Sequence, residues 1–366
     1  MPSATARVVL VTGVSRFLGA RVAGALQAEP GIDRVIGVDT VPPTTPLGRT
    51  EFVRVDIRTP GIAKVISSER VDTVVHLNLV TSQIGPRPKM KELNVIGTMQ
   101  LLAACQRSPD MRKLVVRSSA AVYGSSPRDP AVFAETDEPM EAPSSGYAKD
   151  VTEVEGYVRG LLRRRSDLTV SVLRFANFLG PDVDSPLTRY LRMPVVPTVL
   201  GFDPRLQFIH SGDGAEVVRR MTVEDHPGCY NVAGDGVLLL SQALRRAGRP
   251  SVPVPEASMQ VFGDLGRRFA GLSGFSPELL RWLMYGRVID CSKLAAELRW
   301  RPEHSAESAF TDFVRAAGGG HNPSLEVFDR LVGALGGRSP ATTSHGRSGP
   351  RFGGPRAAPH ENGAGR

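Results

Sequence analysis

Cysteine is scarce in this chain of 366 residues. The three cysteines, Cys105, Cys229 and Cys291, are far apart, form no CxxC pair, and have no neighbouring histidines to complete a set of metal ligands. This pattern excludes a disulfide framework and gives no metal site. It predicts free, buried thiols in a reducing cytoplasm.

Long hydrophobic runs are also missing. No uninterrupted apolar segment approaches the roughly 20 residues that a membrane-spanning helix needs. The first strand-like segment begins within a few residues of Met1, which leaves no room for a secretory leader. We therefore expect a cytoplasmic protein with no membrane partner.

Acidic residues are fewer than basic ones, so the formal net charge is +8. The stretch from Arg338 to Arg366 holds five arginines and one glutamate, which is half of that excess. The run 163–165 of three arginines falls at the end of a predicted helix, where cations complement the helix dipole. The charge is thus explained without a nucleic-acid partner.

Apolar segments typical of strands recur along the first half of the chain, with helix-compatible stretches between most of them. They cover residues 7–11, 34–38, 51–57, 73–77, 113–117 and 169–175. Such alternation predicts an α/β fold, a Rossmann-type doubly wound parallel sheet with helices on both faces. The longest amphipathic helices are expected over 89–106 and 149–163.

A glycine turn follows the first strand. Gly13 lets the chain reverse, and Gly19 lets the next helix, which starts at Phe17 and Leu18, pack closely. The free N–H groups of that helix face an anion, so the pattern predicts a site for a dinucleotide pyrophosphate. Arg16 replaces the usual middle glycine, and its guanidinium either covers the pyrophosphate or fills its space.

Acidic residues end the next two strands. Asp39 comes twenty residues after Gly19, where a carboxylate accepts hydrogen bonds from the adenosine ribose and repels a 2′-phosphate. The expected cofactor is therefore NAD rather than NADP. Asp56 and Ile57 follow the third strand, at a position where an adenine can lie.

Several segments in a fixed order resemble the extended short-chain dehydrogenase/reductases, in particular the NAD-dependent nucleotide-sugar epimerases and dehydratases of the UDP-glucose 4-epimerase type. They are 12–19, 39, 56–57, 76–77, 94–98, 118–124 and 173–177. The resemblance runs from about residue 7 to about residue 313. It implies bound NAD, which Leu77 also contacts, a nucleotide-sugar substrate, hydride transfer at a sugar carbon, and a homodimer formed through the two long helices.

The resemblance also suggests a division of the chain. Residues 1–177 and about 205–235 form the NAD-binding domain, and about 178–204 and 236–317 form a smaller, interleaved substrate lobe. The segment 318–366 is glycine-rich, and from about residue 338 its composition predicts disorder.

The catalytic residues depart from the family pattern. In the family a tyrosine is the general base, a lysine four residues later lowers its pKa, and a serine or threonine assists. Lys149 and Ser119 match, but Ser145 stands at the tyrosine position, and Tyr147 comes only two residues before the lysine. Helix positions i and i+4 share a face, whereas i and i+2 point about 200° apart. Either the helix starts late or bulges, bringing Tyr147 into the site, or Ser145 and Ser119 hold a relaying water.

Substrate contacts are incomplete as well. Asn177 resembles the family's contact to the nucleotide diphosphate, and His210 with Asp213 resembles the segment that closes over it. The arginine expected four residues before His210 is replaced by Leu206. Arg205, one place earlier, is the substitute, although strand alternation turns it to the other face. His76, Asn94 and Tyr123 are interpreted as structural.

Three functions remain open. The first is an NAD-dependent nucleotide-sugar epimerase, dehydratase or related oxidoreductase with altered acid–base residues. The second is a non-catalytic sensor or scaffold that binds NAD(H) or a nucleotide sugar, which the departures at Arg16, Ser145 and Leu206 favour. The third is a reductase of another alcohol or carbonyl compound, since the same sheet serves such chemistry.

Overall fold

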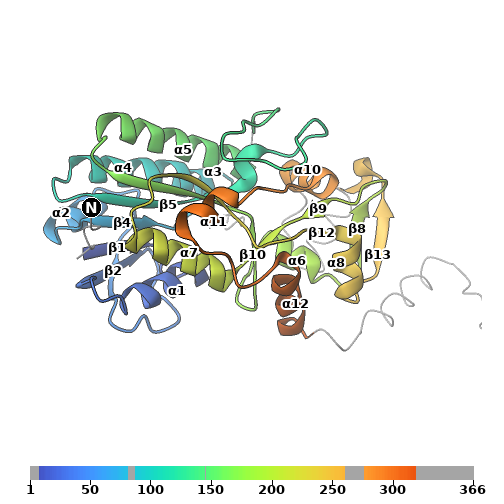
Figure 1. Ribbon diagram of the computed structural model, residues 1–366, viewed down its shortest axis with the longest axis horizontal. Helices are drawn as coiled ribbons and strands as arrows, with labels where there is room; N and C mark the ends of the chain where they lie inside the picture. The colour runs from blue at the N-terminus through green and yellow to red at the C-terminus, as the bar shows by residue number, and fades with distance from the viewer. Residues whose placement is uncertain (1–7, 81–86, 145, 260–275, 319–366) are drawn as a thin grey trace, which may run out of the picture. The chain divides into compact units, whose positions relative to one another are not determined.

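The computed structural model of the protein describes residues 8–80, 87–144, 146–259 and 276–318. Its centre is a seven-stranded sheet in the order β11-β6-β5-β4-β1-β2-β3, in which every neighbouring pair is parallel (Figure 1). The strands are β1 (Val8–Thr12), β2 (Arg34–Asp39), β3 (Glu51–Arg54), β4 (Thr73–His76), β5 (Lys113–Ser119), β6 (Thr169–Phe175) and β11 (Gly228–Val232). The predicted doubly wound parallel sheet is confirmed.

Strand β3 is shorter than the sequence predicts. It ends at Arg54, whereas the apolar pattern extends to Ile57. The reason is a local turn, because the Asp56 carboxylate accepts hydrogen bonds from the Arg58 backbone N–H and guanidinium. The chain therefore leaves the sheet at Asp56.

Helices cover both faces of the sheet. The helices α2 (Gly61–Ser68), α4 (Gly97–Arg107) and α5 (Gly146–Arg164) lie on one face, and α1 (Phe17–Leu26) and α7 (Ser211–Val223) lie on the other (Figure 1). Each face buries its own apolar cluster, as the alternation of β-strand side chains requires. The helix α11 (Ser292–Leu298) also packs on the α1 and α7 face, next to β11.

The helix expected over residues 89–106 is interrupted. It consists of α3 (Arg87–Lys91), a π-helical turn at Glu92–Ile96, and α4. In that turn the buried Asn94 side chain accepts a hydrogen bond from the Val80 N–H at 2.8 Å and donates one to the Val80 carbonyl at 3.1 Å. The irregular turn thus aims Asn94 at the loop after β4, where it is structural, as predicted.

A third apolar cluster is built from the later part of the chain. Three two-stranded pairs accompany it, β7 with β10, β9 with β12, and β8 with β13. The elements are β7 (Asn177–Leu179), α6 (Pro186–Leu191), β8 (Val196–Val199), β9 (Arg205–Leu206), β10 (Phe208–His210), β12 (Leu238–Leu239), α8 (Leu240–Arg246), β13 (Ser251–Val254), α10 (Pro277–Tyr285) and α12 (Ala306–Ala316). The two-domain boundaries stay a proposal, and the expected glycine-rich segment from residue 319 onward lies outside the described residues.

The described helices include none that is both long and apolar enough to cross a membrane. All three cysteines are free, but only Cys105 is buried; Cys229 and Cys291 are partly exposed, so the prediction of burial is wrong for these two. Burial raises the pKa of the Cys105 thiol to about 12, so it stays protonated and unreactive at neutral pH.

Candidate active site

The glycine turn between β1 and α1 leaves room for no larger side chain. Gly13 has a φ of +78°, and its N–H donates to the Val38 carbonyl at 3.0 Å. A Cβ on Gly19 would lie 2.2 Å from the Gly13 carbonyl oxygen. Both glycines are therefore needed for α1 to start directly against the turn, as the sequence predicts.

The N-terminus of α1 is open to an anion. Arg16 occupies the N-cap position without a side-chain capping bond, and the first turn, which contains Phe17, Leu18 and Gly19, has no acidic residue. Backbone N–H groups and the positive end of the helix dipole are therefore available to a phosphate. Burial lowers the pKa of the Arg16 guanidinium, and the nearby Asp39 raises it.

Asp39 is held in place at the end of β2. One carboxylate oxygen accepts a hydrogen bond from the Ser15 N–H at 3.2 Å, and the other accepts one from the Thr40 N–H at 2.7 Å. Lone pairs remain on both oxygens for the hydroxyl groups of a ribose. The glycine cradle, the open α1 N-terminus and this carboxylate together fit a dinucleotide of the NAD type.

Asp56 has a different environment from the one expected. Its carboxylate is paired with Arg58, 2.6 Å from the closest guanidinium nitrogen, and this bond lowers its pKa. Ile57 and Leu77 are buried, and the Leu77 N–H donates to the Thr12 hydroxyl at 3.1 Å. The Asp56 side chain therefore shapes the turn after β3.

His76 joins the ends of β1 and β4 to α4. Its Nε2 lies 2.8 Å from the Thr98 hydroxyl, which itself donates to the Asn94 carbonyl. Thr98 must therefore accept from the Nε2–H group, which leaves Nδ1 to accept from the Thr12 hydroxyl at 2.8 Å. Burial lowers the pKa of His76 to about 4, so it is a neutral structural histidine, as predicted.

This histidine predicts how stability depends on pH. Because the unfolded chain binds a proton near pH 6.5 and folded His76 only near pH 4, unfolding free energy should fall by about 3 kcal/mol as the pH falls between these values. Urea unfolding across this window measures the loss. His76→Gln should reduce the dependence of the unfolding free energy on pH. An unchanged slope in that variant would show that other groups cause the dependence.

The main cavity lies at the carboxyl ends of β5 and β6, beside the start of α1. Four predicted residues line it, namely Phe17, Ser119, Tyr147 and Asn177. The further lining side chains that carry charge or a large ring are Arg87, Arg117, Phe175, Phe178, Asp184, Glu278, Trp282 and Arg287. Substrates of parallel α/β proteins bind at this edge of the sheet.

Tyr147 reaches the cavity from the first turn of α5. The helix begins at Gly146, which has a φ of +73°, so it starts after position 145, and Tyr147 is its second residue. The Tyr147 hydroxyl oxygen is buried and has no hydrogen-bond partner of good geometry among the described residues. Burial raises the pKa of this phenol, while the nearby Arg117 and Ser119 lower it.

Lys149 is not brought to the cavity. It follows Tyr147 by two positions, about 200° around the helix, and it is absent from the cavity wall. Within the described ranges no carboxylate pairs with Lys149. Ser145 lies outside the described residues, so the water relay through Ser145 stays a prediction.

Three arginines give the cavity a positive wall. Arg87 binds the fully buried Asp150 through two bonds of 2.6 and 2.7 Å. Arg287 donates to the Gly124 carbonyl at 2.6 Å, and burial lowers its pKa to about 10. Burial also raises the pKa of Glu278, whose carboxylate accepts a bond from the Ala148 N–H at the start of α5.

Arg205, His210 and Asp213 do not line this cavity. Arg205 is exposed while Leu206 is buried, so the one-residue shift does turn the arginine away. His210 instead stacks on His304, with ring centroids 3.9 Å apart.

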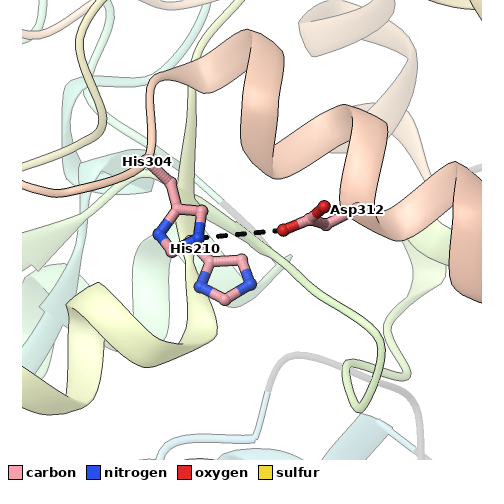
Figure 2. Close-up of side chains that lie close together, drawn as sticks. All are labelled: His210, His304 and Asp312. Carbon is pink, nitrogen blue, oxygen red and sulfur yellow. Dashed lines mark ion pairs between the residues drawn. The ribbon is translucent and has the colours of Figure 1, made fainter.

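Figure 2 shows this second group, His210, His304 and Asp312. The His304 Nδ1 lies 3.0 Å from Asp213, and its Nε2 lies 3.7 Å from Asp312. The Nδ1 of His210 accepts the Gly212 N–H, so its ring must turn before it can ligate a cation together with His304. As it stands, the group ties β10 and α7 to α12.

Sequence reasoning missed Arg117, Arg287 and Glu278. Arg117 lies inside an apolar strand segment, and alternation with Ser119 is the signal that places both side chains on one face of β5. Glu278 and Arg287 come from the later part of the chain and have no local pattern that links them to the site.

Comparison with known proteins identifies the family. The family described as "NAD dependent epimerase/dehydratase family" matches residues 9–233. An uncharacterized protein of Mycobacterium tuberculosis is 45% identical over 318 residues, which is 85% of this chain and 84% of the relative. UDP-glucose 4-epimerase 2 of rice (Oryza sativa subsp. japonica) is 28% identical over 297 residues, covering 68% of this chain and 71% of the relative.

Solved structures share the fold. UDP-glucose 4-epimerase from Thermus thermophilus, in complex with NAD, is 24% identical with a TM-score of 0.65, covering 86% of this chain and all of that one. UDP-glucose 4-epimerase from Thermotoga maritima, with UDP-glucose, is 19% identical with a TM-score of 0.65, covering 84% and 98%.

Proposed function

Because the chain belongs to the NAD-dependent epimerase/dehydratase family, we propose that it is an enzyme that binds NAD and reversibly oxidises a hydroxyl-bearing carbon of a UDP-linked sugar. The 4-epimerases among its relatives and structural neighbours support this substrate class. The cavity supports it too, because Arg287 and Asn177 can bind the diphosphate.

One observation carries the proposal: the Tyr147 side chain lines the cavity beside Ser119, and its buried hydroxyl has no hydrogen-bond partner of good geometry among the described residues. A buried polar atom without a partner is costly, unless a ligand supplies the missing hydrogen bond. We assign Tyr147 as the group that takes the proton from the sugar hydroxyl. Ser119 hydrogen-bonds the same hydroxyl and holds it toward Tyr147.

The residues that would hold NAD are those around the glycine turn. Gly13 and Gly19 admit the pyrophosphate to the α1 N-terminus, Arg16 neutralises its charge, and Asp39 accepts from the adenosine ribose. Bound NAD would supply the hydride acceptor for the sugar carbon, and Tyr147 would take the proton of its hydroxyl.

Oxidation and re-reduction, as in epimerisation, need a single proton acceptor. Dehydration needs a second group to remove a carbon-bound proton, and the carboxylates that line the cavity are Asp184 and Glu278. Asp184 is paired with Arg189, and Glu278 accepts a bond from the Ala148 N–H. The arrangement therefore favours epimerisation over dehydration.

A second candidate is a binding protein without turnover. The observation that favours it is Arg16, which is partly buried beside Asp39 where the pyrophosphate is expected. In this alternative the arginine fills the space that NAD needs.

Arg16→Gly separates these two roles. If the guanidinium binds the pyrophosphate, its loss should weaken NAD binding about tenfold to a hundredfold, since a hydrogen bond to a charged group contributes about 1.5–3 kcal/mol. Calorimetric titration of NAD measures the change. Arg70→Gly is the matched control, because Arg70 is exposed and its φ of 51° suits glycine. Tighter binding by Arg16→Gly would contradict the proposed role.

Turnover is the test of the enzyme. The full chain is incubated with UDP-glucose, UDP-N-acetylglucosamine or UDP-glucuronic acid, with and without added NAD, and products are followed by NMR of the anomeric protons. The proposal expects a second epimer to appear from at least one sugar. NAD binding without any conversion across the panel would favour the binding protein.

A further inference from the structure

An active-site tyrosine needs a positive charge near its oxygen if it is to accept a proton at neutral pH. A cation within reach favours the phenolate, whereas burial favours the neutral phenol. In this chain the lysine that the family pattern offers, Lys149, leaves α5 on the face opposite Tyr147 and does not line the cavity. Another cation must supply the charge.

Arg117 lies on the cavity wall beside Tyr147. It precedes Ser119 by two positions on β5, so both side chains leave the same face of the strand. Its side chain is buried, with the guanidinium carbon 5.3 Å from the Phe178 ring centroid. One terminal nitrogen donates to the Leu79 carbonyl at 3.2 Å.

The charge of Arg117 is left uncompensated. No carboxylate in the described part of the chain forms an ion pair with it, and its buried Nε–H has no acceptor. Arg16 is near enough to repel it. A buried cation in this state is costly, so a nearby group that gains negative charge stabilises it.

The other two arginines that line the cavity have carboxylates nearby. Arg87 is committed to Asp150, and Arg287 faces Glu278 and Asp129. Asp150 and Glu278 themselves disfavour a negative Tyr147. Among the described groups that face the phenol, Arg117 is thus the cation that has no carboxylate partner.

We propose that Arg117, and not Lys149, supplies the positive charge that stabilises the Tyr147 phenolate. It is a positioning residue, because it acts through Tyr147. The meaning of this role rests on the proposed function, in which Tyr147 takes the proton of the sugar hydroxyl. The electrostatic pairing itself does not require a ligand, so it is tested in the ligand-free protein.

The test follows the ionisation of position 147 alone. A fluorinated tyrosine is incorporated at this position in the full chain, which lowers the intrinsic pKa of the phenol and gives a single ¹⁹F NMR signal. The signal is titrated with pH in four proteins, which carry Arg117, Arg117→Met, Arg117→Lys, or Lys149→Met. Circular dichroism at each pH reports whether the chain stays folded.

Arg117→Met should lower the phenolate fraction about tenfold or more at any pH below the midpoint. Arg117→Lys should restore most of it, and Lys149→Met should leave the titration unchanged. A shift caused by Lys149→Met overturns the proposal even if Arg117→Met fails to fold. Equal titration of Arg117→Met and the parent protein also overturns it. If the titrations give the expected result but no UDP-sugar is converted, the proposed function is wrong, whereas the pairing of Arg117 with Tyr147 still holds.

Discussion

Tyr147→Phe should abolish turnover of the UDP-sugar while leaving NAD and substrate binding nearly unchanged. The variant removes one hydroxyl, which we propose as the proton acceptor and which has no hydrogen-bond partner of good geometry among the described residues. Positioned acid–base groups contribute about 10²–10⁴-fold to rate, so kcat should fall by at least about a hundredfold. Steady-state kinetics and calorimetry with the same substrate measure the two effects.

Tyr157→Phe is the matched control for this change. Tyr157 is on the same helix, but its side chain is 39% exposed and it does not line the cavity. Its loss should leave kcat within about twofold of the parent, as expected for surface substitutions. If Tyr147→Phe retained the parent kcat, another group would have to accept the proton.

Glu155→Gln should cause the largest loss of stability among the substitutions considered. Glu155 pairs with Arg174 at 2.7 Å, and the two side chains are 6% and 12% exposed. The carboxylate also accepts the Ser118 hydroxyl, and Arg174 lies over the ring of Tyr123. Removing one charge of a buried pair leaves the other uncompensated, so unfolding free energy should fall by about 3–5 kcal/mol.

Glu153→Gln is the control for this prediction. Glu153 is on the same helix and pairs with Lys91 at 3.3 Å, but both side chains are partly exposed. An exposed ion pair contributes about 0–1 kcal/mol, so this variant should unfold almost like the parent. Equal losses for both substitutions in urea unfolding would show that the helix, and not the buried pair, determines the effect.

The cofactor cradle is predictable from the sequence because its requirements are local. Gly13 needs a left-handed backbone, and Gly19 has no room for a Cβ. Strand period and turn chemistry place Asp39 at the end of β2. Each of these constraints acts within one strand–turn–helix unit, so the order of residues reveals it.

The part of the candidate site around Tyr147 is harder to predict. Sequence spacing correctly separates Tyr147 from Lys149 on the helix, but it does not say which of the two faces the cavity. Packing of α5 on the sheet decides this, because the face that contains Tyr147 also buries Val151 and Val154.

Contacts between residues far apart in the sequence cannot be predicted from local residue spacing. Glu278 reaches the Ala148 N–H across 130 residues of sequence, and Arg287 reaches Gly124 across 163. For Arg205 the sequence suggested a contact that the structure does not show. Its position next to that of the family's arginine suggested a phosphate contact, but the strand turns its side chain to solvent.

A crystal structure of the full chain with NAD and a UDP-sugar tests the central claim most directly. The account predicts that the Tyr147 hydroxyl lies within about 3 Å of the sugar hydroxyl to be oxidised. The Arg117 guanidinium should lie beside the phenol, and Lys149 should point away from it. A sugar hydroxyl bound by a different proton acceptor, with Tyr147 out of reach, would contradict the account.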